Sequence, residues 1–334
     1  ARSPNLDLRN GALLMTPLFH AGITWQARIA AKQVRLHPPL QGQSPARARG
    51  RGELDPLKAF VTLLLAFNPA TAFSANHAIL SSRSSATTKR PDHPQMAAAH
   101  EILPAAKSPC SAAVVWLHGF GDGPDGWVSS LEQARVRHPN WKWVHLRAPA
   151  LPQPCYRGVP VPSWGDYHDP GCTRVGSADY DNEDIVSEAT LAEVHRIVDE
   201  LEDSDGIPAE RVMIGGFSMG ATAAAETALR YPKRLGGLVV LNGWLTPAAR
   251  RALDTTASKG MRVLVSHGSE DEQVGFDCGE AAVKLFKEAG VSVTFEVQPG
   301  LKHVQSGFGP GRDLAAKFLA DVLGPCEDES SRVG

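Results

Sequence analysis

Short apolar runs recur through the last two thirds of this chain, and stretches with helical spacing separate them. Apolar runs of this length without alternation are typical of strands buried on both faces of a parallel sheet. Between two of them, Val194, Ile197, Val198 and Leu201 recur at i, i+3, i+4 and i+7, the spacing of an amphipathic helix. The pattern predicts an α/β fold with a mostly parallel central sheet and helices on both faces. The expected strands span 111–117, 141–146, 212–215, 237–241, 262–265 and 291–297.

Two helix boundaries can also be predicted. We expect one helix from Trp127 to about Arg135. We expect another, which Asn182 or Asp184 would cap, to end near Asp203.

Residues 147–184 lack this periodicity. They hold six prolines and several aromatic residues, and so long a loop inside a compact domain is usually functional. We expect Trp164 in this loop to line the substrate pocket, and the alternative is that its ring anchors the loop to the core. Trp244, just after the strand at 237–241, is the second expected substrate-binding residue.

The sharpest local pattern is Gly216-Phe217-Ser218-Met219-Gly220, which lies between a predicted strand and an alanine-rich helix. A Gly-x-Ser-x-Gly turn in this setting is the nucleophile elbow of the α/β-hydrolases. Its serine has a strained backbone, and glycine two positions away on either side lets strand and helix pass closely. The pattern predicts an α/β-hydrolase fold with Ser218 as the nucleophile.

A serine hydroxyl is a weak nucleophile at neutral pH. Ser218 therefore requires an imidazole base, and that base requires a carboxylate to fix its tautomer. Asp271 follows the strand at 262–265, and His303 follows the strand at 291–297. The order serine, acid, histidine is that of the α/β-hydrolases, and ligands bind open α/β sheets at this edge.

Neighbouring side chains offer alternatives for two of these roles. Glu270 or Glu272 could replace Asp271 as the acid. His267 could replace His303, although its place at a strand end before glycine favours a structural role.

The loop after the first long strand is the expected source of an oxyanion-hole donor, the backbone N–H of Phe120. The alternative is a plain strand-to-helix turn in which Asp122 caps the helix. His118 is expected to orient or pack this loop rather than to act as the base.

The first 95 residues differ in charge and pattern from the rest. They hold 12 Lys and Arg against 4 Asp and Glu, whereas the remainder holds 22 against 32. Residues 24–55 are polar and without periodicity, which predicts disorder. The apolar run at 57–67 is too short to span a bilayer as a helix, and Ala70-Thr71-Ala72 after it is similar to a signal-peptide cleavage site. We expect no transmembrane span.

The sequence allows two cellular locations. The apolar run, together with the Ser- and Thr-containing stretch at 81–90, is typical of plastid or secretory targeting. Met96 could instead start a cytoplasmic enzyme, which we expect, because the residues that follow suffice for a whole catalytic domain. The expected organisation is an N-terminal extension at 1–104, largely disordered, a catalytic domain at 105–325 and a disordered tail at 326–334.

The composition limits the kinds of partner and ligand that we expect. The mildly acidic body argues against a nucleic acid as partner. The five cysteines lack zinc-ligand spacing and predict reduced thiols, with a bridge between Cys155 and Cys172 left open. We expect no metal and no cofactor, and the sequence leaves the oligomeric state unknown.

From about Ser111 to Leu323 the chain resembles the phospholipase/carboxylesterase family of α/β-hydrolases, which includes acyl-protein thioesterases and lysophospholipases. The matching motifs are Leu117-His118-Gly119-Phe120-Gly121-Asp122, Pro162-Ser163-Trp164-x-Asp166, Gly206-Ile207-Pro208, Gly215-Gly216-Phe217-Ser218-x-Gly220, His267-Gly268-x-x-Asp271 and Gly300-x-x-His303.

The resemblance implies a serine hydrolase that cleaves carboxylic esters or thioesters through an acyl-enzyme. It implies Ser218, Asp271 and His303 as the triad, and the N–H groups of Phe120 and Met219 as the oxyanion hole. The implied substrates are acylated proteins, small esters or lysolipids. A non-catalytic binding protein with a hydrolase fold is the alternative class.

Three departures from the family pattern bear on the acyl preference. Met219 and Ala221 stand where thioesterases commonly have glutamine and glycine, and Gly165 stands where a bulky aromatic residue is common.

Overall fold

A computed structural model of the protein describes residues 99–324. The predictions of a disordered extension, a targeting sequence and a C-terminal tail therefore fall almost wholly outside the described residues, as does Cys326.

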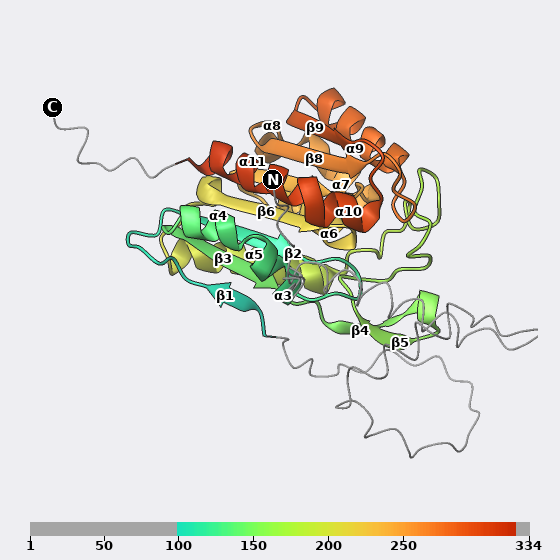
Figure 1. The fold of residues 1–334 in the computed structure, drawn as a ribbon, viewed down its shortest axis with the longest axis horizontal. Helices are drawn as coiled ribbons and strands as arrows, with labels where there is room; N and C mark the ends of the chain where they lie inside the picture. Colours follow the sequence, from blue (N-terminus) through green and yellow to red (C-terminus); the bar gives the residue numbers. More distant parts are fainter. Residues whose placement is uncertain (1–98, 325–334) are drawn as a thin grey trace, which may run out of the picture. The chain divides into compact units, whose positions relative to one another are not determined.

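A seven-stranded sheet forms the centre of the described domain (Figure 1). Six of its strands are parallel, and only the edge strand β1 runs antiparallel to its neighbour β3. All six residues of β2 and of β6 are buried, as expected for strands covered on both faces. In spatial order the strands are β1 (Glu101–Leu103), β3 (Trp141–Leu146), β2 (Ala112–Leu117), β6 (Val212–Phe217), β7 (Gly237–Leu241), β8 (Arg262–Gly268) and β9 (Ser292–Gln298).

Helices cover both faces of this sheet, so the expected α/β-hydrolase architecture is confirmed. One face packs against α5 (Glu188–Asp203), α6 (Met219–Arg230) and α9 (Phe276–Glu288). The other packs against α3 (Asp125–Ser130), α4 (Glu132–Arg137) and α11 (Arg312–Leu323). The shorter helices are α7 (Pro247–Arg251), α8 (Thr256–Lys259) and α10 (His303–Ser306).

The folded domain starts earlier than the expected boundary at residue 105. Strand β1 pairs with β3 in the register Ile102↔Val144, yet its own residues are only half-buried or exposed. A three-residue edge strand has too little apolar pattern to be recognised in the sequence.

Two other local expectations were wrong. The helix expected from Trp127 is split at Leu131 into α3 and α4. The cap of α5 is Ser187, whose hydroxyl accepts the N–H of Thr190, whereas Asn182 accepts the N–H of Asp184 in a turn before the helix.

The long loop at 147–184 contains a hairpin of β4 (Ala150–Gln153) and β5 (Val159–Pro162). Its prolines hid the hairpin from the sequence pattern, because proline cannot donate to a strand ladder and is tolerated only at sheet edges. A two-stranded sheet apart from the central one consists entirely of edges and therefore tolerates them.

The two elbow glycines are required by close backbone contacts. A side-chain carbon at Gly220 would collide with the carbonyl oxygens of Leu117 and His118 at the end of β2. One at Gly216 would lie 2.7 Å from the Leu117 oxygen. Glycine thus lets the start of α6 pass directly over the neighbouring strand end.

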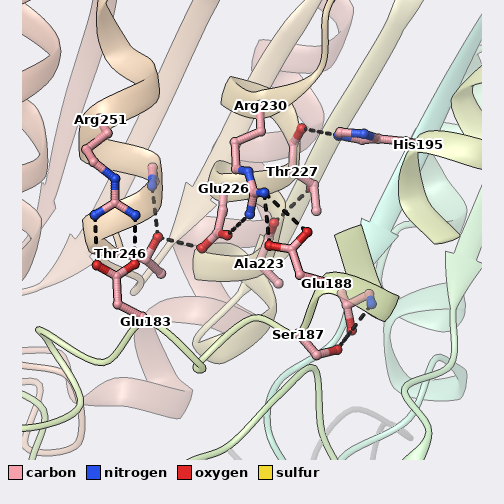
Figure 2. Close-up of polar contacts among 12 residues, drawn as sticks. Glu183, Ser187, Glu188, His195, Ala223, Glu226, Thr227, Arg230, Thr246 and Arg251 are labelled. Carbon is pink, nitrogen blue, oxygen red and sulfur yellow. Dashed lines mark hydrogen bonds and ion pairs between the residues drawn. The ribbon is translucent and has the colours of Figure 1, made fainter. Parts of the chain in front are cut away.

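Behind the elbow, α6 carries a buried carboxylate, that of Glu226 (Figure 2). Its oxygens accept from Thr246 Oγ1 at 2.5 Å and from Arg230 Nη1 at 2.7 Å. Arg230 also pairs with Glu188, at the start of α5. Burial raises the pKa of Glu226, and the bonds from Thr246 and Arg230 oppose that rise.

We expect Glu226→Ala to lower the free energy of unfolding by about 3 kcal/mol, because Arg230 and the buried Thr246 hydroxyl lose their shared partner. Urea unfolding would measure the change. The matched control is Glu188→Ala, which removes the exposed partner of the same arginine and should cost about 0.5 kcal/mol.

The raised pKa of Glu226 also predicts a pH effect on stability. The folded state holds this proton more tightly than the unfolded chain does. The contribution of Glu226 is therefore most favourable below the unfolded pKa and declines as the pH rises through the folded value. In Glu226→Gln this part of the pH dependence should vanish. An unchanged slope of unfolding free energy against pH would contradict the assignment.

Candidate active site

Ser218 lies in the sharp turn between β6 and α6. Its backbone has φ 58° and ψ −129°, a left-handed conformation that costs a non-glycine residue free energy. Its N–H donates to the carbonyl of Leu241 at the end of β7, which helps to hold the turn. The hydroxyl is thereby presented at the carboxyl edge of the sheet.

His303 and Asp271 complete a continuous hydrogen-bond chain with this serine. His303 Nε2 lies 2.9 Å from Ser218 Oγ, and His303 Nδ1 lies 2.6 Å from Asp271 Oδ2. All three residues are at most 5% exposed. Asp271 follows β8, and His303 starts α10 after β9, so three strand ends bring the three groups together.

Asp271 is held by more donors than the sequence indicated. The backbone N–H groups of Gln273 and Val274 both donate to its Oδ1 at 2.9 Å. Burial alone would raise the pKa of this carboxyl, but the charge of His303 and the bonds from His267 and His303 hold it well below the usual range. The carboxylate therefore stays ionised and fixed in orientation.

Asn242 is a site residue that the sequence reasoning did not single out. Its Nδ2 donates to Asp271 Oδ2 at 2.7 Å, and its Oδ1 accepts from Ser306 Oγ at 3.1 Å. The only sequence signal was its place directly after the strand β7.

The alternative acids make no bond to His303, and the alternative base makes none to Ser218. Glu270 and Glu272 have exposed side chains, and Glu272 lies 3.7 Å from Lys302. His267 Nε2 donates to the Val274 carbonyl at 2.9 Å and lies 3.4 Å from Asp271, so it supports the acid rather than the nucleophile.

His118 fixes the loop after β2. Its Nε2 accepts the N–H of Ala148 at 3.0 Å, so the ring proton is on Nδ1, which donates to the Gly119 carbonyl at 2.8 Å. Burial lowers the pKa of His118 to about 4, which keeps the ring neutral. A side-chain carbon at Gly119 would lie 3.5 Å from Ser218 Cβ, so this loop directly adjoins the serine.

The two tryptophans expected to bind substrate are both buried. Trp164 is 3% exposed, and its indole N–H donates to the His118 carbonyl at 2.8 Å. This ring thus anchors the long loop to the loop after β2, as the alternative reading held. Trp244 is fully buried beside Tyr167, with ring centroids 5.9 Å apart. Contact of either ring with substrate stays a prediction.

The family departures have packing explanations. Met219 is fully buried, and its sulfur accepts from Ser163 Oγ at 3.4 Å. Ala221 packs against Gly243. A side-chain carbon added at Gly243 would lie only 2.8 Å from Ala221 Cβ. At Gly165 a side-chain carbon would lie 2.6 Å from the Ile185 carbonyl oxygen, so the backbone itself occupies the space of the missing aromatic ring.

The remaining expectations concern cysteines and membranes. The four described cysteines, Cys110, Cys155, Cys172 and Cys278, are free thiols, so the Cys155–Cys172 bridge is not formed.

Within residues 99–324 no helix combines the length and apolar character that crossing a membrane requires.

Known proteins are similar to this chain in sequence and in fold. A family described as Phospholipase/Carboxylesterase matches residues 98–309. The chain is 36% identical to Carboxylesterase SOBER1 of Arabidopsis thaliana, over 57% of this chain and 82% of that protein. It is 31% identical to Acyl-protein thioesterase 1 of Gibberella zeae, over 67% of this chain and 95% of that protein. The crystal structure of Arabidopsis thaliana SOBER1 has a TM-score of 0.57 at 32% identity, and the match covers 64% of this chain and 99% of that one.

Proposed function

This chain belongs to the phospholipase/carboxylesterase family of α/β-hydrolases, and we propose that Ser218, His303 and Asp271 form the triad with which it cleaves carboxylic esters or thioesters. The unbroken hydrogen-bond chain from the Ser218 hydroxyl to the Asp271 carboxylate carries this proposal. The family and the hydrolase class were both expected from the sequence, and both are confirmed.

The proposed mechanism assigns each step of acyl transfer to one of these three groups. Ser218 Oγ attacks the carbonyl carbon while its proton passes to His303 Nε2. The imidazolium then gives this proton to the departing alcohol or thiol, which leaves an acyl group on the serine. Water, deprotonated by the same nitrogen, attacks the acyl-enzyme and releases the acid. Asp271 stabilises the imidazolium throughout and keeps the proton of the neutral ring on Nδ1.

Two backbone N–H groups are proposed to stabilise the oxyanion. Met219 is the first residue of α6, and the first N–H groups of a helix have no partner within it. The Gly119 carbonyl is held by His118, so the N–H of Phe120, on the opposite side of the same trans peptide, points away from that bond. Each such donor contributes about 3 kcal/mol of transition-state stabilisation.

The proposed substrates are acylated proteins or small acyl esters, because relatives at about one third identity are named carboxylesterase and acyl-protein thioesterase. Lysophospholipids are the alternative. Phe120 packs against Tyr156 and Tyr167, with ring centroids 6.1 Å and 5.3 Å away, so the oxyanion loop has apolar surroundings suited to an acyl chain.

We expect kcat/KM to rise about three- to fourfold for each methylene added to a short acyl chain, until the pocket is filled. An ester and a thioester with the same acyl group should differ by about tenfold or less, because both present the same carbonyl to the triad. A series of matched esters, thioesters and a lysophospholipid, assayed with the purified protein, measures this. Failure to hydrolyse any of them would favour the non-catalytic binding protein.

A further inference from the structure

Asn242 occupies an unusual position among the groups around the proposed triad. It leaves β7 with φ 52°, a left-handed conformation that Asn tolerates better than most residues, and it is fully buried. The orientation of its amide is fixed by chemistry. The ionised Asp271 can only accept, so the Nδ2 group must face it, and the Ser306 hydroxyl then donates to Oδ1.

Together with the helix α10, these bonds form a closed ring of four residues: His303, Asp271, Asn242 and Ser306. His303 and Ser306 are the first and last residues of α10, one helical turn apart. His303 bonds to Asp271 Oδ2 directly, and Ser306 reaches the same oxygen through the Asn242 amide. The acid and the base are therefore joined twice, once directly and once through Asn242.

The backbone beside this side chain is bonded to β8 and to the turn that carries the nucleophile. The N–H of Asn242 donates to the Ser266 carbonyl on β8 at 2.9 Å. The carbonyl of the preceding residue, Leu241, accepts the N–H of Ser218 at 2.8 Å. Asn242 thus lies between two strand ends. Ser218 follows one of them, β6, and Asp271 follows the other, β8.

We propose that Asn242 is a positioning residue for ester hydrolysis, which sets the orientation of the Asp271 carboxylate toward His303 and is itself held by Ser306. The inference rests on the proposed function of the triad. It assigns no contact with substrate to Asn242, which acts only through Asp271.

The titratable groups that face the Asp271 carboxylate are few among the described residues. His303 and His267 lie against it directly. Tyr167 and Cys278 lie farther off, and their pKa values are raised by burial above all and by this carboxylate in smaller part. A charge placed at residue 242 would act first on Asp271, whose Oδ2 lies 2.7 Å from the Asn242 amide, and through it on the two histidines.

The test compares four variants at residues 242 and 306, with Ser218→Ala as the control, against the wild type in the hydrolysis of p-nitrophenyl acetate across pH. Asn242→Gly keeps the left-handed backbone and removes the amide, so kcat should fall about 10- to 100-fold with KM within about twofold. Asn242→Asp keeps the shape and places a second carboxyl group against Asp271. Two carboxyl groups this close share a proton at low pH, and once the pair loses it the added negative charge favours the imidazolium form of His303. The acid limb of its pH profile should move up by about one unit or more.

Ser306→Ala tests the other side of the ring. It should lower kcat about 3- to 10-fold, and the double variant Asn242→Gly/Ser306→Ala should be no slower than Asn242→Gly alone, because Ser306 acts through the amide. Multiplicative effects of the two changes would show that Ser306 acts independently and would overturn the ring. Thermal unfolding of each variant separates lost positioning from lost folding.

The proposal fails if Asn242→Gly and Asn242→Asp both keep the wild-type kcat and acid limb while hydrolysis still depends on Ser218. If Ser218→Ala hydrolyses the ester as well as the wild type does, the proposed function fails instead. The two failures are therefore distinguishable in one set of assays.

Discussion

Replacing Ser218 with alanine is expected to lower kcat for esters and thioesters by about 10⁶-fold, to the level set by binding and the oxyanion donors alone. The hydroxyl is the only group of the proposed triad that can bond to the substrate carbon, and its partner His303 would have nothing to deprotonate. Alanine can occupy the same left-handed turn at a cost similar to that of serine, so the unfolding temperature should change little. Single-turnover kinetics and thermal unfolding would measure the two quantities.

A matched control separates the nucleophile from any buried serine. Ser258 lies in the short helix α8 and is 2% exposed, and its hydroxyl donates to the Leu253 carbonyl. No residue of this helix belongs to the proposed site. Ser258→Ala should keep full activity. A fluorophosphonate probe should label the wild type and Ser258→Ala but not Ser218→Ala. Labelling of a serine other than Ser218 would refute the assignment.

Replacing Asp271 with asparagine is expected to lower kcat by about 10⁴-fold, and the surroundings of this side chain explain why. The N–H groups of Gln273 and Val274 require an acceptor at Oδ1, so the amide oxygen of the new side chain must stay there. Its NH₂ group then takes the place of Oδ2 and donates to His303 Nδ1. The histidine proton is driven to Nε2, which can no longer accept from Ser218.

The neighbouring acids provide the controls for this variant. Glu270→Gln and Glu272→Gln remove carboxylates from the same loop whose side chains are exposed to solvent. Both should retain kcat within about twofold. A loss in Glu272→Gln as large as that in Asp271→Asn would show that the acid had been wrongly assigned.

Most of the sheet could be predicted from the sequence, because its central strands are apolar along their whole length. The run at 141–146 matches β3 residue for residue, and the run at 237–241 matches β7. The weak elements were missed. Strand β1 is short and partly exposed, the β4–β5 hairpin is rich in proline, and the cap Ser187 had Asn182 and Asp184 as competitors nearby.

In the proposed site, too, the residues with a clear sequence pattern could be predicted and the others could not. Ser218, Asp271 and His303 were accessible to sequence reasoning because each follows a recognisable strand, and parallel strands end at one edge. The role of Trp164 could not be predicted, since an aromatic ring in an irregular loop can either face a ligand or anchor the loop. The bond from its indole to the His118 carbonyl favours anchoring, and only the folded chain contains it.

The sequence by itself determined the fold class, the family and the order of serine, acid and histidine, because these depend on local patterns of apolar and glycine positions. The tertiary structure alone decided how the Asp271 carboxylate is held. Asn242 and Ser306 lie 29 and 64 residues from the groups they bond to, and no periodicity connects positions so far apart. The backbone bonds that join Asn242 to Ser266, and its neighbour Leu241 to Ser218, likewise connect positions far apart in the sequence.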